Sequence, residues 1–134
     1  MKFKLKTNNL SQNFIEQIQK EIPHLPSNHF DDILIGFGEV LQNIIRHAYK
    51  NHISENDFID IQYQVLDNKL IIKLRDYAEP CHPESFLNRH FLPNESGHMG
   101  LSIIRKLTDE FTIQPLKDGN ETKLVFKVRK LIEV

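Results

Sequence analysis

The longest regular pattern in the chain runs from Asn28 to about Asn51 and has the period of an α-helix. Its apolar side chains recur every three or four residues, which places them along one face of that helix. Ser27 or Asn28 can cap the first turn, because both side chains accept hydrogen bonds from free backbone N–H groups. A helix with one apolar face needs a second layer of structure to cover it. The apolar positions are Phe30, Ile33, Leu34, Phe37, Leu41, Ile44, Ile45 and Ala48.

Two elements are predicted before this helix. Lys2–Thr7 alternates polar and apolar residues, which is typical of a half-buried strand at the edge of a sheet. A first helix follows, and Pro23 and Pro26 end it, because proline lacks the N–H group that continues a helix. The apolar positions of this first helix are Leu10, Phe14, Ile15, Ile18 and Ile22.

Two strands and a helix are predicted after it. Phe58–Leu66 and Leu70–Asp76 alternate with period two on either side of Asp67-Asn68, a turn sequence that favours an antiparallel hairpin. Helical spacing of apolar residues then returns in Gly100–Glu110.

A second hairpin completes the predicted fold, with Phe111–Leu116 and Thr122–Val128 on either side of the turn Asp118-Gly119-Asn120. Helices interspersed with antiparallel strand pairs predict an α+β fold, a two-layer α/β sandwich. We expect its sheet to be mixed and mostly antiparallel, with the helices on one face. A length of 134 residues fits one such domain, spanning residues 1–134.

The composition excludes several classes of function. Seventeen Lys and Arg residues against eighteen Asp and Glu residues give a net charge of -1, and no basic run indicates nucleic acid or an anionic membrane as partner. No apolar stretch approaches the roughly 20 residues that cross a bilayer. Cys81 is the only cysteine and the N-terminus lacks the apolar core of a signal peptide, so we expect a cytoplasmic protein.

Three polar side chains share one stripe of the long helix, about 130° from the centre of its apolar face: Glu39, Asn43 and His47. A glutamate can act as a general base. An asparagine side-chain oxygen suits Mg²⁺ that is also held by phosphate groups. The pattern alone leaves a second interpretation open, namely an ordinary solvated helix face.

Asp76 ends an apolar strand, where a carboxylate can accept a hydrogen bond from a ligand bound over the sheet, such as the amino group of adenine. A turn-initiating aspartate ahead of a proline-rich loop is the alternative. The connection that follows, residues 77–97, is long, and such loops are commonly functional. We expect a lid at about residues 77–99, ending where Gly97 and Gly100 open a helix whose N–H groups can face phosphates.

Four segments together resemble the histidine kinase/gyrase B/Hsp90-like ATPases. Residues 39–49, EVLQNIIRHAY, resemble the N box of that superfamily, and the His-x-Tyr after Asn43 is the form seen in anti-sigma-factor kinases. Residues 76–83 resemble its Asp-x-Gly-x-Pro box, with Ala78 in place of the usual glycine. Residues 97–104 are similar to its second glycine box, and residues 119–122 to its final Gly-x-x-Thr element.

The resemblance implies a serine/threonine protein kinase that binds Mg-ATP, phosphorylates an anti-sigma antagonist and binds a sigma factor, as a possible homodimer. It implies that Glu39 accepts the proton of the substrate hydroxyl, Asn43 holds Mg²⁺ and Asp76 reads adenine. The alternative is a nucleotide-sensing binding module without phosphotransfer. Further positions that the resemblance assigns to the nucleotide are His47, Ala78, Pro80, Gly97, His98, Met99, Gly100, Leu101, Arg105 and Thr122.

Overall fold

The structure is a computed structural model, and it describes residues 1–22, 27–66, 68–80 and 99–127. The elements follow the predicted order of strand, two helices, hairpin, helix and hairpin. They are β1 (Lys2–Lys4), α1 (Leu10–Glu21), α2 (Ser27–Asn43), the π-helical turn η1 (Ile44–Ala48), β2 (Phe58–Leu66), β3 (Lys69–Asp76), α3 (Met99–Leu107), β4 (Glu110–Leu116) and β5 (Gly119–Lys127).

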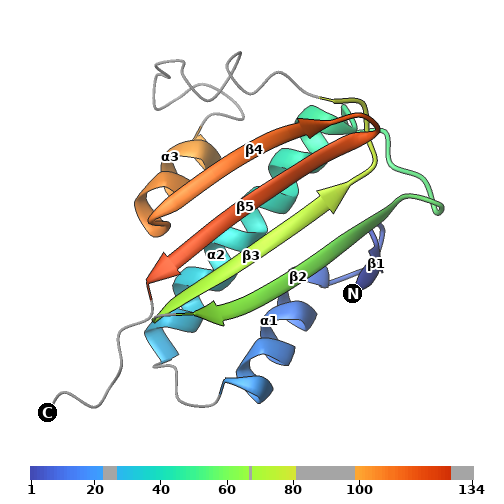
Figure 1. Ribbon diagram of the computed structural model, residues 1–134. Helices are drawn as coiled ribbons and strands as arrows, with labels where there is room; N and C mark the ends of the chain where they lie inside the picture. Colours follow the sequence, from blue (N-terminus) through green and yellow to red (C-terminus); the bar gives the residue numbers. More distant parts are fainter. Residues whose placement is uncertain (23–26, 67, 81–98, 128–134) are drawn as a thin grey trace, which may run out of the picture.

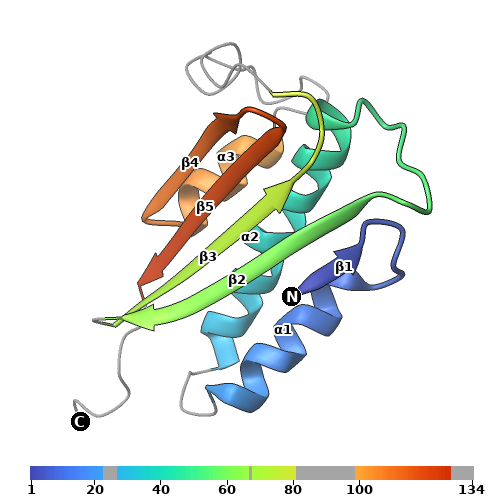
Figure 2. The ribbon, with the colours of Figure 1, turned by 45° about the vertical axis from the view of Figure 1, so that its right-hand side comes forward.

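The five strands form one sheet in the order β1-β2-β3-β5-β4, with β1 at the edge as predicted. Figures 1 and 2 show α1, α2 and α3 together on one face of this sheet. The predicted two-layer α+β sandwich is therefore confirmed. The expectation of a mixed sheet is corrected for the described strands, where every pairing is antiparallel. None of the helices in the described part of the chain is long and apolar enough to cross a membrane.

Two predicted element ends are corrected by local hydrogen bonds. The first strand stops at Lys4 instead of Thr7, because the Thr7 N–H turns back to the Lys4 carbonyl at 3.0 Å. The last helix stops at Leu107 instead of Glu110. There the Thr108 hydroxyl binds the carbonyl oxygen of Ile104 at 2.7 Å, and Glu110 already belongs to β4.

The second hairpin is tighter than predicted. Gly119 and Asn120, expected in the turn, already pair with Leu116 and Pro115 as the first residues of β5. The period-two alternation of β5 consequently starts two residues earlier than Thr122. This shift points the side chains of Asn120 and Thr122 to the same face of the sheet.

Aromatic rings join the two layers of the core. Phe14 of α1 stacks on Phe37 of α2 with 4.7 Å between ring centroids, and Tyr63 of β2 meets the same Phe14 ring edge-on at 5.8 Å. Both phenylalanines are fully buried. This packing fixes α2 across the sheet, so that its C-terminal end lies over β3, β5 and β4.

Candidate functional site

A pocket lies between two parts of the molecule: the C-terminal part of α2 together with η1, and the strands β3, β4 and β5. Figure 1 shows α2 crossing behind these strands. Its volume, including space open to solvent, is about 340 Å³. Pockets for small molecules are mostly apolar with a few polar groups, and this one has that character. The apolar lining residues are Val40, Ile44, Ala48, Phe111 and Ile113, and the polar ones are Asn43, His47, Asp76, Asn120 and Thr122.

Asn43, the last residue of α2, lines this pocket and is only 5% exposed. The alternative of a solvated helix face is therefore wrong for Asn43. Among the described residues, its side-chain Nδ2 is buried without a hydrogen-bond partner. A buried donor left in this state costs free energy of folding, on the order of 1–3 kcal/mol. A ligand with an acceptor group would remove that cost.

The helix widens into a π-helical turn immediately after Asn43. The Tyr49 N–H donates to the Ile44 carbonyl at 3.2 Å, a spacing of five residues instead of four. Lys50 and Asn51 then adopt positive φ angles of 53° and 65°, so the helix ends before the predicted Asn51. Single π-helical turns are rare and occur frequently at functional sites. This one carries His47 to the pocket.

Glu39 lies four residues before Asn43, one helical turn along α2, and is half-buried. It is not among the residues that line the pocket. The structure therefore brings Asn43 and His47 to one pocket and leaves Glu39 outside its lining.

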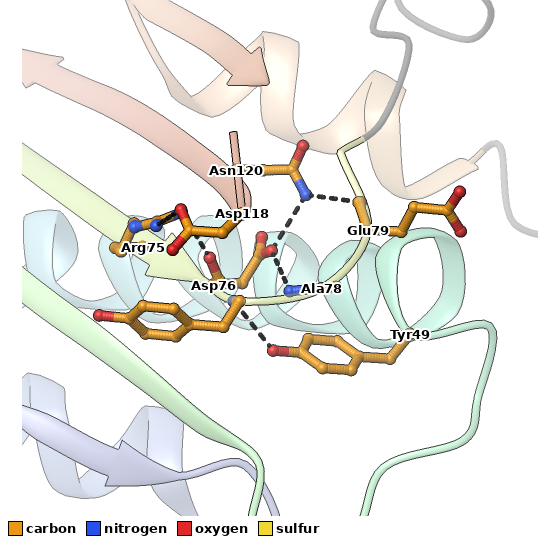
Figure 3. Close-up of polar contacts among 8 residues, drawn as sticks. Tyr49, Arg75, Asp76, Ala78, Glu79, Asp118 and Asn120 are labelled. Atoms are coloured by element: carbon orange, nitrogen blue, oxygen red, sulfur yellow. Dashed lines mark hydrogen bonds and ion pairs between the residues drawn. The ribbon is translucent and has the colours of Figure 1, made fainter. Parts of the chain in front are cut away.

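Asp76, the last residue of β3, is the most buried acidic side chain described at the site, with 1% exposure. Its Oδ1 accepts two hydrogen bonds, from Asn120 Nδ2 at 3.0 Å and from the Ala78 N–H at 3.1 Å (Figure 3). The same Asn120 Nδ2 also donates to the Glu79 carbonyl at 3.2 Å. The backbone N–H of Asn120 also interacts with this carboxyl. The Asp76 carboxyl is thus held from several sides, and a carboxylate has further lone pairs with which to accept a hydrogen bond from a ligand.

Burial raises the pKa of the Asp76 carboxyl above its ordinary value. The hydrogen bonds from Asn120 and from the Ala78 N–H lower that pKa, and so does the nearby charge of Arg75. Burial also raises the pKa of the Tyr49 phenol, which accepts a hydrogen bond from the Tyr77 N–H at 3.2 Å. That bond holds the segment after β3 against the end of η1.

Arg75 connects the end of β3 to the β4–β5 turn. Its Nη1 donates to the Asp76 carbonyl at 2.9 Å, and its Nη2 pairs with Asp118 Oδ1 at 2.6 Å (Figure 3). The guanidinium also lies over the Tyr77 ring, 4.5 Å from its centroid. Gly119 makes this approach possible, because a Cβ atom there would overlap the Asp76 carbonyl and the Arg75 guanidinium, at a φ of 153°.

Ala78 creates no backbone strain at the position where the resemblance expects glycine. It is not among the residues with positive φ, and its N–H contributes directly to the Asp76 contact. Pro80 is the last described residue of this segment, while Gly97 and His98 lie outside the described residues. Met99, Gly100 and Leu101 form the first turn of α3. Arg105 is exposed further along α3, and Thr122 lines the pocket at 1% exposure.

Asn120 is the site residue that sequence reasoning missed, because it was assigned to a turn. One signal could have found it. The period-two spacing of the predicted strand extends back from Thr122 to Asn120, which places Asn120 on the same face as Thr122, Leu124 and Phe126. The pairing of Asp76 with Asn120 in the β3–β5 register is what makes this position important.

Solved structures share this fold at low sequence identity. The histidine kinase domain from the Erythrobacter litoralis EL346 blue-light activated histidine kinase matches with a TM-score of 0.59 and 16% identity, over 88% of this chain and 61% of that one. The catalytic domain of histidine kinase ThkA matches with 0.59 and 16%, over 96% of this chain and 95% of that one.

A third structure contains the RsbU and RsbW domains of Rv1364c from Mycobacterium tuberculosis, with a TM-score of 0.57 and 14% identity. The match covers 97% of this chain and 32% of that one, and this chain likewise spans only 32% of the longer Erythrobacter kinase structure. Curated protein sequences give no match. The family described as "Histidine kinase-like ATPase domain" matches residues 6–126. With nearly its whole length matched, the chain belongs to the histidine kinase-like ATPase domain family.

Proposed function

We propose that the pocket binds ATP, with the adenine at Asp76 and the triphosphate directed toward Asn43 and the start of α3. The observation that carries this proposal is the Asp76 carboxylate, which is buried in the pocket lining with Oδ1 held by two donors. The apolar lining of the pocket suits a flat base, and the membership of an ATPase family supports ATP as the ligand.

The residues present fit Mg²⁺ as a cofactor shared with phosphate. The Asn43 side chain lines the pocket, and its amide oxygen is the kind of ligand that Mg²⁺ takes. Its buried Nδ2, which has no partner among the described residues, could donate to a phosphate oxygen. Among the described residues, no group of three or more Asp, Glu, His or Cys side chains could hold a metal ion. Bound Mg²⁺ would neutralise phosphate charge. The first N–H groups of α3, from Met99 and Gly100, are suited to bind phosphate oxygens.

We further propose a protein kinase that transfers the γ-phosphoryl group to a serine or threonine hydroxyl. In this reaction the hydroxyl oxygen bonds to the γ-phosphorus, the bond to the β-phosphate oxygen breaks, and ADP leaves. Glu39 accepts the hydroxyl proton, one helical turn from Asn43. His47 and Arg105 lie near the phosphates in this proposal.

The proposed substrate is an anti-sigma antagonist, and the proposed second partner is a sigma factor. Support comes from the His47-Ala48-Tyr49 sequence and from the similarity to a structure that contains an RsbW domain. Such a protein would act in the cytoplasm as a single domain, and two copies could pair as a homodimer. One observation favours the alternative, a nucleotide-sensing module without phosphotransfer: Glu39 does not line the pocket.

Calorimetry with Mg-ATP tests the nucleotide assignment. We expect binding by the wild-type protein and at least a tenfold loss in Asn43→Ala, because the buried amide then no longer meets its ligand. Gln42→Ala is the matched control, since Gln42 is the exposed neighbour on the same helix. If Mg-ATP gives no heat and no thermal shift with the wild type, the assignment fails.

Glu39→Gln separates the kinase from the sequestering module. The substitution keeps the size of the side chain and removes its basicity, so ATP affinity should stay within about twofold while phosphoryl transfer slows by ~10²–10⁴-fold. The assay uses labelled ATP and a candidate antagonist protein. A wild-type protein that binds ATP and its partner but transfers no phosphate would favour the module. Wild-type rates in Glu39→Gln would remove the general-base role.

A further inference from the structure

Asn120 touches the acidic group of the proposed base site directly. It is 1% exposed, it lies opposite Asp76 in the β3–β5 register, and its Nδ2 bridges Asp76 Oδ1 and the Glu79 carbonyl at 3.0 and 3.2 Å (Figure 3). We propose that Asn120 is a positioning residue that aims the Asp76 carboxylate at the 6-amino group of the base. Arg75 holds the turn that presents Asn120. This inference rests on the proposed ATP site.

The geometry follows from how a carboxylate is held. The Asp76 carboxyl group can rotate about the bond to its Cβ atom unless hydrogen bonds fix its plane. Two donors reach Oδ1 from different directions, the Ala78 N–H from its own segment and Asn120 Nδ2 from the neighbouring strand. With both in place, Oδ2 keeps one direction. Without the side-chain amide of Asn120, only backbone N–H groups in the described part of the chain, those of Ala78 and Asn120, remain to orient the group.

The side chain of Asn120 is itself placed by the β4–β5 turn. Asp118 and Gly119 immediately precede it, and Arg75 binds Asp118 while it also binds the Asp76 carbonyl. Gly119 allows the two strands to approach closely at this point. The Arg75 side chain is 21% exposed and that of Asp118 is 75% exposed, so solvent screens this ion pair. The two bonds of Arg75 nevertheless link the turn to the end of β3.

Charge selects which base the site accepts. An ionised carboxylate accepts a hydrogen bond from an amino group at C6 of a purine, whereas a protonated carboxyl can donate to an oxygen at that position. Burial raises the pKa of Asp76, and the hydrogen bond from Asn120 opposes that rise. In the part of the chain that the structure describes, charged or titratable groups near Asp76 are Arg75 on β3, and His47 and Tyr49 at η1. Asn120 thus favours the form of Asp76 that recognises an amino group.

The test compares ATP with purine riboside triphosphate, which lacks the 6-amino group, and with ITP, which carries an oxygen there. We expect wild-type protein to prefer ATP over purine riboside triphosphate by about tenfold or more, as a site built to bond a polar group does. Asn120→Asp replaces the donor with an acceptor at the same size. It should reduce that preference to about twofold or less and improve relative binding of ITP.

Asn68→Asp is the matched control, because it makes the same chemical change at an exposed position that tolerates both residues at φ 62°. It should leave the preference unchanged. A double variant distinguishes positioning from a general structural effect. Once Asp76→Asn has removed the acceptor, adding Asn120→Asp should change the ratio of the two dissociation constants no further. The inference is overturned if Asn120→Asp lowers this ratio as much in the Asp76→Asn background as it does in the wild type.

Arg75→Lys adds a milder step, because lysine cannot bind the Asp76 carbonyl and Asp118 with a rigid fork. We expect it to lower the preference for ATP by roughly threefold, less than Asn120→Asp. If Asn120→Asp does not fold, Asn120→Leu replaces it in the test. This variant removes the amide donor without adding a carboxylate, and the same ratio of dissociation constants is measured. A folded Asn120 variant with the full wild-type preference overturns the inference. A wild-type ratio near one would instead overturn the adenine role of Asp76.

Discussion

The strand pair β3–β5 has two ends that are equally buried and chemically opposite. At one end, Leu70 faces Phe126 and Ile72 faces Leu124 on the helix-covered side of the sheet. At the other end, Asp76 faces Asn120. No side chain in these pairs is more than 4% exposed. Burial therefore does not distinguish the core from the site, whereas the pairing of polar groups does.

The difference shows where the chain places its stability and where it places recognition. The apolar end gains from removing hydrocarbon from water, roughly 25 cal/mol for each Å². The polar end gains little, because Asp76 and Asn120 exchange bonds to water for bonds to each other. Asn43, which lines the same pocket, even leaves a donor without a partner among the described residues. Substitutions at the two ends should consequently have opposite effects.

The largest effect is expected at the apolar end. Leu124→Ala removes a fully buried side chain and leaves a cavity, so the free energy of unfolding should fall by about 2–5 kcal/mol. Urea denaturation measures this loss. The dissociation constant for ATP of the folded fraction should stay within about threefold. A large loss of ATP affinity without a loss of stability would contradict the division between the two ends.

The opposite sign is expected at the polar end. Asp76→Asn keeps an oxygen for both donors and removes a buried charge, so the free energy of unfolding at neutral pH should rise by about 0.5–2 kcal/mol. ATP binding should weaken.

The pH dependence gives a second readout of the same substitution. Because the pKa of Asp76 is raised in the folded protein, the folded state holds the proton more tightly than the unfolded chain does. Its contribution to stability is fully present below the unfolded value of 3.8 and is lost as pH rises through the folded pKa. Asp76→Asn should lack this loss in urea titrations at several pH values. Parallel curves for both proteins would show that Asp76 is not the group responsible.

The smallest effect is expected on the outer face of the same strands. Lys73 lies directly opposite Lys123 there, and like charges in that arrangement repel. Lys73→Glu should raise the free energy of unfolding by about 0.2–1 kcal/mol, and Lys73→Gln by less. Added salt should reduce the gain, because both side chains are near solvent. A destabilised Lys73→Glu protein would show that repulsion does not govern this face.

The fold was predictable because its signals are local. The apolar spacing of α1 and α2 and the alternation of β2 and β3 each lie within a short stretch of sequence, and they indicate element types directly. The element ends were less predictable. Thr7 and Glu110 were misplaced because single hydrogen bonds in turns decided those ends, and Gly119 was misplaced because it pairs with Leu116 in the second hairpin.

The site was only partly predictable, because its key contact is not local. Asp76 and Asn43 carried recognisable chemistry in sequence. The partner of Asp76 did not, since Asn120 becomes its neighbour only when β5 pairs with β3 in one particular register. The roles of all the predicted site residues stay predictions; Glu39 lies outside the pocket lining, and Gly97 and His98 lie outside the described residues.

The π-helical turn η1 changes how sequences of this kind should be aligned. A turn closed by a five-residue step holds one residue more than the α-helical turn it replaces. Counting positions from Asn43 as if the helix were uniform therefore misplaces Tyr49 around the helix axis. A chain with one residue fewer between Asn43 and Tyr49 would present different side chains to its ligand. Chain length at this point is as much a part of the site as any side chain.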